Sequence, residues 1–407
     1  MHLNTKLLPY GLALLAFCGI CDAFHVHIPL IIIWILSFST LFLFTYARKY
    51  FPQNGQLRII DIYLIWNIFC ILRGCFVAEN YWDWKSLIST SIGLLMPTLC
   101  YVFTSPRYDI ILLRNLIKSA IIIFPLLLLF SPHSDRPGRY LTFFYLFMIG
   151  ISALRLKWKI ITLIVVLFSC FYELDARSNI VRAIFAICIG LLYYLRNYII
   201  KYLRYIQRFV SFVPILLLFL AATDRFNIFK INEYFGSSTI TKIENGEIKE
   251  VDLSADTRTL LYKEVIESAI KNHHIIWGRT PARGYESQLF TLDSYENRNK
   301  KIRIGERHGT EVSILNIFLH TGLIGVILYF FIFYYGSYLS IFKSRNIYIK
   351  LIGLFIVFRW CYSWIEDFNQ FDINYAILWM LISICYSQNF RKMTNIEFKN
   401  WLLNITK

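Results

Sequence analysis

The sequence predicts an all-α polytopic membrane protein with about twelve transmembrane helices and one long outer loop that contains an amphipathic helix. Of the 407 residues, 57% are hydrophobic and 18% are aromatic. A soluble core cannot bury this much apolar surface, so the lipid bilayer must act as the solvent. Apolar runs recur along the chain, and one long polar segment, 224–311, interrupts them.

Each apolar run predicts one membrane span, because a helix needs about 20 residues to cross the bilayer core. The first run lacks a small-residue signal cleavage site near Cys18 and Cys21, and the next run follows at once, so we interpret it as a helix. The predicted spans are 8–24, 28–47, 59–78, 86–104, 110–130, 139–154, 158–174, 180–196, 205–223, 315–342, 347–365 and 375–389.

The distribution of charge predicts the orientation of these spans. Lys and Arg gather in the turns at 48–58, 155–159, 196–208, 343–350 and 391–407, and acidic residues gather in the alternate turns. The positive-inside rule then places both termini in the cytoplasm and the polar segment outside. That segment holds 14 Lys and Arg and 14 Asp and Glu, so the net charge of +16 lies in the inner turns and does not indicate nucleic-acid binding.

The chain therefore divides into four parts: nine spans in 1–223, a loop with the functional motifs in 224–314, three spans in 315–389, and a cytoplasmic tail in 390–407. None of the nine cysteines falls in 224–311, and we interpret Cys18 and Cys21 as packing residues rather than a redox pair. His273 and His274 lack cysteine or carboxylate partners at metal-ligand spacing, so we predict no metal site and no cofactor.

Arginines at the outer ends of spans need a partner or a function, because charge is costly in a membrane. Arg73 lies near the end of the third span, and Arg177 and Arg182 flank the start of the eighth. Guanidinium groups suit phosphate because their planar donors can bind it at more than one point. These arginines are expected either to line a cavity for an anionic group or to pair locally, with Glu79, Asp83 or Asp175 as the available carboxylates.

Two further outer turns carry polar residues. In the turn 131–140, Arg136 and Arg139 are expected to be solvated, although they could add to the same positive field. Glu366, Asp367 and Asp372 lie among aromatic residues before the last span. Such a turn suits sugar hydroxyls and rings, and an ordinary interfacial turn would look the same.

The polar loop is expected to be irregular from 224 to about 254 and helical thereafter. Ser254 or Asp256 is a suitable N-cap, and Leu261, Val265 and Ala269 follow at four-residue steps. The pattern predicts an amphipathic helix that lies on the bilayer or over the mouth of a cavity.

Three arginines in this loop could hold an anion. Arg258 falls in the first turn of the predicted helix, where a cation and the helix N-terminus can bind an anion together, although a plain surface arginine is an alternative. Arg279 and Arg283 lie in the turn WGRTPARGY, whose glycines and proline let the backbone approach a ligand.

These features occur in a recognisable order: Arg177-Ser178 at the start of a span, Arg258 leading the loop helix, Gly278-Arg279 in a turn, and LHTGLIG at 319–325 opening a span. Together they resemble the O-antigen polymerase and O-antigen ligase superfamily, membrane glycosyltransferases of bacterial surface polysaccharide assembly. The resemblance covers about 175–328 by motif and the whole chain by topology.

The resemblance implies a chemistry and a location. The family transfers a glycan from undecaprenyl diphosphate to an acceptor hydroxyl at the outer face of the bacterial inner membrane, so the loop would be periplasmic. In polymerases the acceptor is another lipid-linked repeat unit, and in ligases it is a lipid A core sugar or a protein. A flippase and a chain-length regulator of the same pathway are the implied partners.

This chain departs from the family pattern at one position. Many members have a His-Asn pair eleven residues before the first glycine of the terminal motif, and here that position, counted from Gly322, is Glu311. The nearby histidine is His308, which could also be a plain surface residue. The difference moves the chain away from the pattern most typical of ligases, so we favour a polymerase.

The same residues suit metal-independent glycosyl transfer. Arginines can stabilise the charge that develops on a diphosphate leaving group, and a histidine or carboxylate can deprotonate the attacking hydroxyl. We expect His308 or Glu311 to act as the base. The expected diphosphate-binding residues are Arg177, Arg258 and Arg279, supported by Arg182, Arg283 and Arg73.

The roles of one histidine and two glycines stay open at this point, and so do two other functions. His320 could cap, pack or face the cavity, and the glycines at 322–325 are expected to serve close helix packing. A lipid-linked oligosaccharide flippase should show an internal repeat between its halves, and none is evident. In a membrane scaffold protein, alanine at the loop arginines should have no effect.

Overall fold

The computed structural model describes residues 7–20, 29–51, 55–130, 136–172, 177–223, 225–230, 239–244, 247–252, 258–287 and 306–407. Over these residues the fold is helical apart from two short antiparallel strand pairs. The predicted all-α class is therefore confirmed for the described part of the chain.

Six segments of the described chain are long and apolar enough to cross a membrane. They contain α3 (Leu30–Ala47) with η3 (Arg48–Tyr50), η4 (Gly55–Leu57) with α4 (Arg58–Val77), α5 (Tyr81–Leu94) with η5 (Met96–Thr104), α6 (Pro106–Phe130), α12 (Leu203–Ala222) and α16 (Ser313–Lys343). The protein is thus a helical membrane protein, and the count of twelve crossings stays a prediction.

The other helices are shorter. Three of them are apolar: α2 (Gly11–Ile20), which follows η1 (Leu8–Tyr10), α10 (Arg177–Leu192) and α18 (Ile373–Tyr386). The remainder are α7 (Arg136–Tyr140), η6 (Leu141–Phe143), α8 (Phe144–Ile149), η7 (Ile151–Ala153), α9 (Leu156–Phe171), α11 (Arg196–Ile199), α14 (Thr259–Lys271), α17 (Ile347–Tyr362), α19 (Gln388–Lys392) and α20 (Asn395–Ile405).

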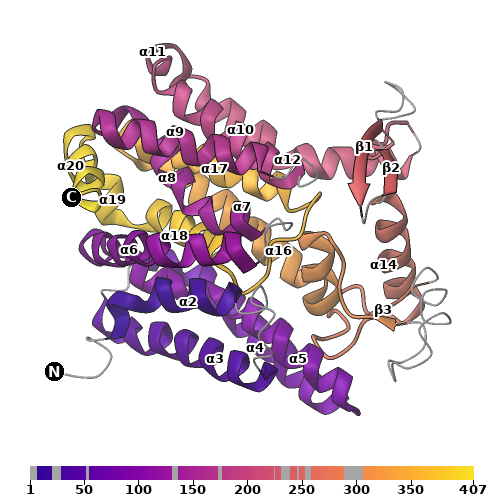
Figure 1. Ribbon diagram of the computed structural model, residues 1–407. Coiled ribbons are helices and arrows are strands. Elements are labelled where there is room, and N and C mark those ends of the chain that lie inside the picture. Colours follow the sequence, from indigo (N-terminus) through magenta and orange to yellow (C-terminus); the bar gives the residue numbers. More distant parts are fainter. Residues whose placement is uncertain are drawn as a thin grey trace.

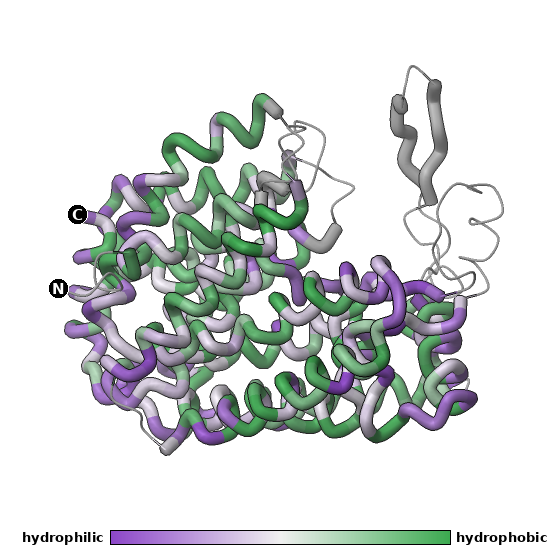
Figure 2. Tube along the Cα trace, turned by 90° about the horizontal axis from the view of Figure 1, so that it is seen from below, coloured by the Kyte–Doolittle hydropathy of each residue, from purple (hydrophilic) through white to green (hydrophobic). Residues whose placement is uncertain are grey.

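Both described ends of the chain lie at one end of the helix bundle. On α6, Arg114 donates to the carbonyl of Asn404 and Asn115 donates to the carbonyl of Pro9. The loop elements, among them α14, lie at the opposite end (Figure 1). Hydrophilic residues gather at these two ends and hydrophobic residues lie between them (Figure 2), as expected for a protein in a bilayer.

Several predicted spans are not continuous α-helices, among them 86–104 and 139–154. The segment 86–104 changes from α5 to the 3-10 helix η5, because Pro97 has no N–H and its ring clashes with the carbonyl four residues earlier. Asn67 donates to the carbonyl of Leu94 that the break leaves free. The segment 139–154 is divided into α7, η6, α8 and η7, and its residues 140–149 are buried among the other helices.

The loop contains more regular structure than its sequence predicts. Strands β1 (Thr239–Glu244) and β2 (Glu247–Asp252) form an antiparallel hairpin within the segment expected to be irregular. The predicted amphipathic helix is α14, with Leu261 and Val265 buried and Ile270 exposed. Its N-cap position is Arg258, whose side chain makes no capping hydrogen bond. The predicted caps at 254 and 256 lie outside the described residues.

The predicted C-terminal tail is folded against the bundle. Thr394 and Glu397 form a capping box that starts α20. The indole of Trp401 donates to the carbonyl of Pro106 at 2.9 Å, so α20 is held on the first turn of α6.

Candidate functional site

The glycine-arginine turn of the loop, which contains Gly278 and Arg279, packs against α16 where that helix is broken. Gly322 has a φ of 69° inside the helix, a backbone conformation that favours glycine. A Cβ there would lie 2.2 Å from the carbonyl oxygen of Ile276. Nearby, the backbone N–H of Arg279 donates to the carbonyl of Leu319 at 2.7 Å. Gly322 therefore packs against the loop backbone and not against a helix, whereas a Cβ at Gly325 would lie 3.5 Å from Trp66 of α4, as the predicted role in helix packing requires.

Arg279 and Arg283, both predicted to bind diphosphate, converge on Glu306. Glu306 begins β4 (Glu306–Arg307), which pairs with β3 (Tyr285–Glu286). Arg279 Nη2 lies 2.9 Å from one carboxylate oxygen, and Arg283 Nε lies 3.1 Å from the other. The hydrogen bond to Glu306 raises the pKa of Arg283. The pairing of these arginines could not be read from the sequence, because Glu306 lies more than 20 residues from either of them.

Arg258 joins the loop helix to the segment before α18. Its Nη1 donates to Glu311, its Nη2 lies 3.4 Å from Glu366, and its Nε donates to the carbonyl of Ile365 at 3.1 Å. Arg307 donates to the other oxygen of Glu311 at 3.1 Å. Burial raises the pKa of Glu366, and the positive field of Arg258 opposes that shift. Arg258 is therefore part of a charged cluster and not a plain surface arginine.

The remaining predicted arginines lie in different places. Arg73 donates to the carbonyl of Trp277 at 2.8 Å, so it holds the glycine-arginine turn, instead of pairing with Glu79 or Asp83. Arg182 is buried and donates to the side chain of Asn179 on its own helix. The eighth predicted span begins at Arg177 as α10, but the side chain of Arg177 lies outside the described part.

His308 lines a polar cavity of about 300 Å³. Its Nε2 lies 3.9 Å from Oδ1 of Asp83. Burial lowers the pKa of His308, the carboxylates of Glu306 and Asp83 oppose this, and two nearby arginines add to the lowering. The lowered pKa favours the neutral imidazole, which is the form that can accept a proton. Glu311, the other predicted base, is more than half exposed, and both of its oxygens are engaged by arginines.

The same cavity contains residues that the sequence did not single out as catalytic. Asp367 accepts hydrogen bonds from the hydroxyl of Ser313 and the backbone N–H of Asn369, both at 3.2 Å. Burial raises the pKa of Asp367. His320 also lines the cavity, with Nδ1 3.3 Å from the carbonyl of Thr280. The cavity thus holds two histidines and a carboxyl group beside the loop arginines.

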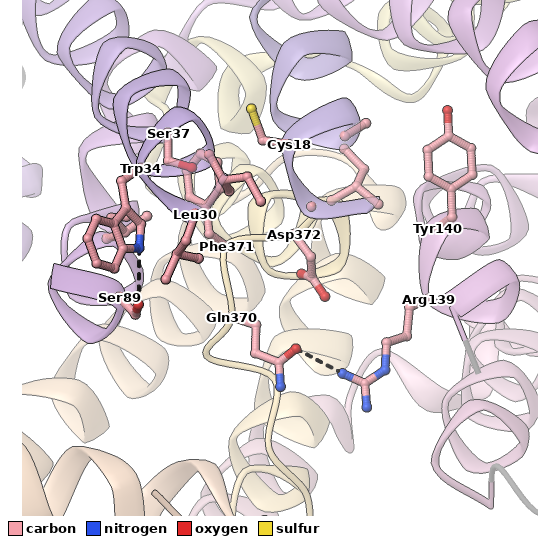
Figure 3. Close-up of a pocket in the computed structure, with 15 residues that line it drawn as sticks. Cys18, Leu30, Trp34, Ser37, Ser89, Arg139, Tyr140, Gln370, Phe371 and Asp372 are labelled. Atoms are coloured by element: carbon pink, nitrogen blue, oxygen red, sulfur yellow. Dashed lines mark hydrogen bonds between the residues drawn. The ribbon is translucent and has the colours of Figure 1, made fainter. Parts of the chain in front are cut away.

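Figure 3 shows a second cavity, which has a volume of about 420 Å³. The two share Ser89, Gln370 and Phe371 as walls. Arg139 lines the second cavity, is partly exposed, and donates to Gln370 at 3.3 Å. The side chain of Arg136 lies outside the described residues. Asp372 also lines this cavity and caps α18 by accepting the N–H of Tyr375 at 2.8 Å.

Over the described residues, no group of three or more His, Cys, Asp or Glu side chains could hold a metal ion. Comparison with protein-family models, with curated proteins and with solved structures finds no match to this chain. The chemistry of the two cavities and of the charged loop is therefore the evidence for function.

Proposed function

We propose that this protein is a membrane glycosyltransferase of surface polysaccharide assembly. As an O-antigen polymerase, it transfers glycan from an undecaprenyl diphosphate-linked donor to the hydroxyl of a lipid-linked acceptor repeat unit. The observation that carries the proposal is the position of His308, which lines a cavity and lies 3.9 Å from the carboxylate of Asp83 and close to a cluster of arginines, at one end of a membrane helix bundle. The resemblance in motif order supports the same assignment.

The reaction needs a base and a site for the leaving group; His308 in the cavity is the proposed base, and Arg258, outside the lining of that cavity, is the proposed site for the leaving group. His308 removes the proton of the acceptor hydroxyl while the hydroxyl oxygen attacks the anomeric carbon of the donor. The bond from that carbon to the diphosphate oxygen breaks, and the electron pair leaves with the diphosphate. Arg258 stabilises the added negative charge. A single displacement of this kind inverts the anomeric carbon.

Of the two candidate bases we favour His308 over Glu311. His308 lines the cavity, and the oxygens of Glu311 already accept hydrogen bonds from Arg258 and Arg307. Asp367 lies in the same cavity and is suited to position a sugar hydroxyl. Arg279 and Arg283 act mainly through Glu306, and direct contact with the diphosphate stays a prediction for them.

The proposed location is the bacterial inner membrane, with both termini cytoplasmic and the loop periplasmic. Support comes from the positive-inside pattern of the sequence. The two described ends also meet at one end of the bundle while α14 lies at the other (Figure 1). A flippase and a chain-length regulator of the pathway are the proposed partners.

The experiment is complementation of a deletion strain with wild type, His308→Gln or Glu311→Gln, followed by gel separation of the lipopolysaccharide. Loss of the ladder down to one repeat on the core in the deletion strain supports a polymerase. Loss of every repeat, with polymer accumulating on the lipid carrier, identifies a ligase instead. A full ladder with both variants would exclude the proposed bases.

A further inference from the structure

An apolar groove of about 750 Å³ lies beside the charged loop cluster. α12 forms one wall and α14 another, and the residues after α17 and the segment 225–230 complete it. Its apolar lining includes Leu217, Leu218, Ala221, Tyr262, Ile266 and Trp364. The groove is therefore chemically unlike the two polar cavities.

Hydrogen bonds hold α12 against α17 at this groove. Pro214 has no N–H, so the carbonyl of Val210, four residues earlier, lacks its helical donor. The thiol of Cys361 donates to that carbonyl at 3.0 Å, and the indole of Trp360 donates to the next carbonyl, of Ser211, at 2.9 Å. Pro214 and Cys361 both line the groove, so its wall is fixed where α12 meets α17.

The groove lies on a helix that faces lipid. On α12 the side chains of Phe212, Leu216 and Phe219 are each more than half exposed, as expected for contact with acyl chains. Ile266 of α14 lines the groove and is also exposed. A hydrocarbon chain could therefore pass from the bilayer into the groove without crossing a polar surface.

Three consecutive residues connect the groove to the catalytic cavity. Ile365 lines the groove, and its carbonyl accepts a hydrogen bond from Arg258. Glu366 lies 3.4 Å from the same guanidinium, and Asp367 lines the polar cavity that contains His308. Along this path the surface is apolar in the groove, cationic at Arg258 and polar in the cavity of His308. A lipid-linked saccharide has the same order, with a hydrocarbon chain, an anionic phosphate group and a sugar.

We infer that the groove binds the polyprenyl chain of the lipid-linked substrate, with its phosphate at Arg258 and its sugar directed into the cavity of His308. This inference rests on the proposed function. Lys230 and Lys263 line the groove and add positive charge near the phosphate. Glu311, being more than half exposed, is the carboxylate that the phosphate displaces from Arg258.

The test compares two tryptophan substitutions on α12. Ala221→Trp fills the groove, whereas Ile215→Trp places the same ring on the lipid-facing side of the helix, outside the groove lining. Each purified full-length protein in lipid nanodiscs is titrated with undecaprenyl phosphate, and bound lipid is quantified by native mass spectrometry. Ala221→Trp should weaken binding by at least about tenfold, which corresponds to about 1.4 kcal/mol, and Ile215→Trp should not.

Equal binding by Ala221→Trp and wild type would overturn the inference. So would equal competition by phosphatidylglycerol, because the groove would then hold ordinary membrane lipid. His308→Gln separates this inference from the proposed function, since it should bind undecaprenyl phosphate normally and lose glycan transfer. If wild type binds the lipid and Ala221→Trp does not, yet no glycan is transferred, the groove assignment stands and the proposed function fails.

Discussion

Glu306 is the residue on which the loop arginines depend. It accepts hydrogen bonds from Arg279 and Arg283, and all three side chains are less than one-fifth exposed. Removing the carboxylate would leave two largely buried cations without this acceptor. Single residues that neutralise buried charge in this way contribute more to stability than surface ion pairs do.

We therefore expect Glu306→Ala to destabilise the protein by about 3 to 5 kcal/mol, the usual cost of breaking a buried pair. The measurement is thermal unfolding in detergent, where the melting temperature should fall clearly. Lys271→Ala is the matched control, since its partner Glu286 and Lys271 itself are both exposed, and it should change little. Similar melting temperatures for the two variants would contradict the proposed role of Glu306.

His308 predicts the pH dependence of transfer. Burial depresses its pKa in the folded protein, so the neutral, proton-accepting form persists below the ordinary histidine pKa of about 6.5. The transfer activity should not change with pH around neutrality, and it should fall only when the pH drops below about 6.5. The measurement is kcat/KM against pH for the purified enzyme with a lipid-linked donor.

The two candidate bases give different results in that assay. If His308 is the base, Glu311→Gln keeps the acid limb of wild type, and His308→Gln lowers the rate by about 10² to 10⁴. An inactive Glu311→Gln enzyme with an active His308→Gln enzyme would reverse the assignment. The same depressed pKa means that His308 contributes stability that is present above about pH 6.5 and lost as the pH falls through its folded pKa.

At the scale of elements, the site depends on interruptions in helices. α16 breaks at Gly322 and accepts the turn of Gly278, which also has a φ of 69°. α5 gives way to η5 near Pro97, and α12 bonds to α17 through the carbonyl of Val210, which Pro214 leaves without its helical donor. Each interruption releases backbone groups that a distant segment then satisfies, as backbone at membrane depth requires.

We expect Gly322→Ala to disrupt the contact between α16 and the loop. The conformation of Gly322, with φ 69° and ψ −171°, is essentially restricted to glycine and costs an alanine about 1 to 3 kcal/mol, and the added Cβ would also meet the Ile276 carbonyl at 2.2 Å. Thermal unfolding should show a loss larger than that cost, and complementation should show a reduced glycan ladder. Gly55→Ala, where a Cβ meets no atom within 4 Å, is the control and should behave as wild type. Unchanged stability and glycan display in Gly322→Ala would show that the break does not hold the loop.

At the scale of the whole molecule, the proposed topology predicts that the two ends of the helix bundle are accessible from opposite sides of the inner membrane. The helices α14 and α20 lie at opposite ends of the bundle (Figure 1), and they carry the exposed residues Lys271 and Lys399, respectively. In whole cells with a permeabilised outer membrane, a maleimide that cannot cross the inner membrane should label Lys271→Cys and not Lys399→Cys. Labelling of Lys399→Cys should appear only after the inner membrane is lysed. Labelling of both residues before lysis would contradict the proposed topology.

The sequence alone determined that this protein is a helical membrane protein. Length and hydropathy are local properties, so most helices lie close to the predicted ranges, and α14 was predicted with its buried Leu261 and Val265. Polar composition likewise predicted that the candidate functional residues gather in the loop, and their roles stay a prediction.

Only the tertiary structure decided which of those residues meet. Glu306 binds two arginines, Arg73 holds a turn about 200 residues away, and the fold separates His308 from Glu311, with one in a cavity and the other at Arg258. The breaks in the helices were not predicted either. A break is stable only where a partner satisfies the freed backbone groups, and that partner lies far away in the sequence. Contacts between residues far apart in the chain leave no periodic signal in its sequence, and the folded backbone alone brings them together.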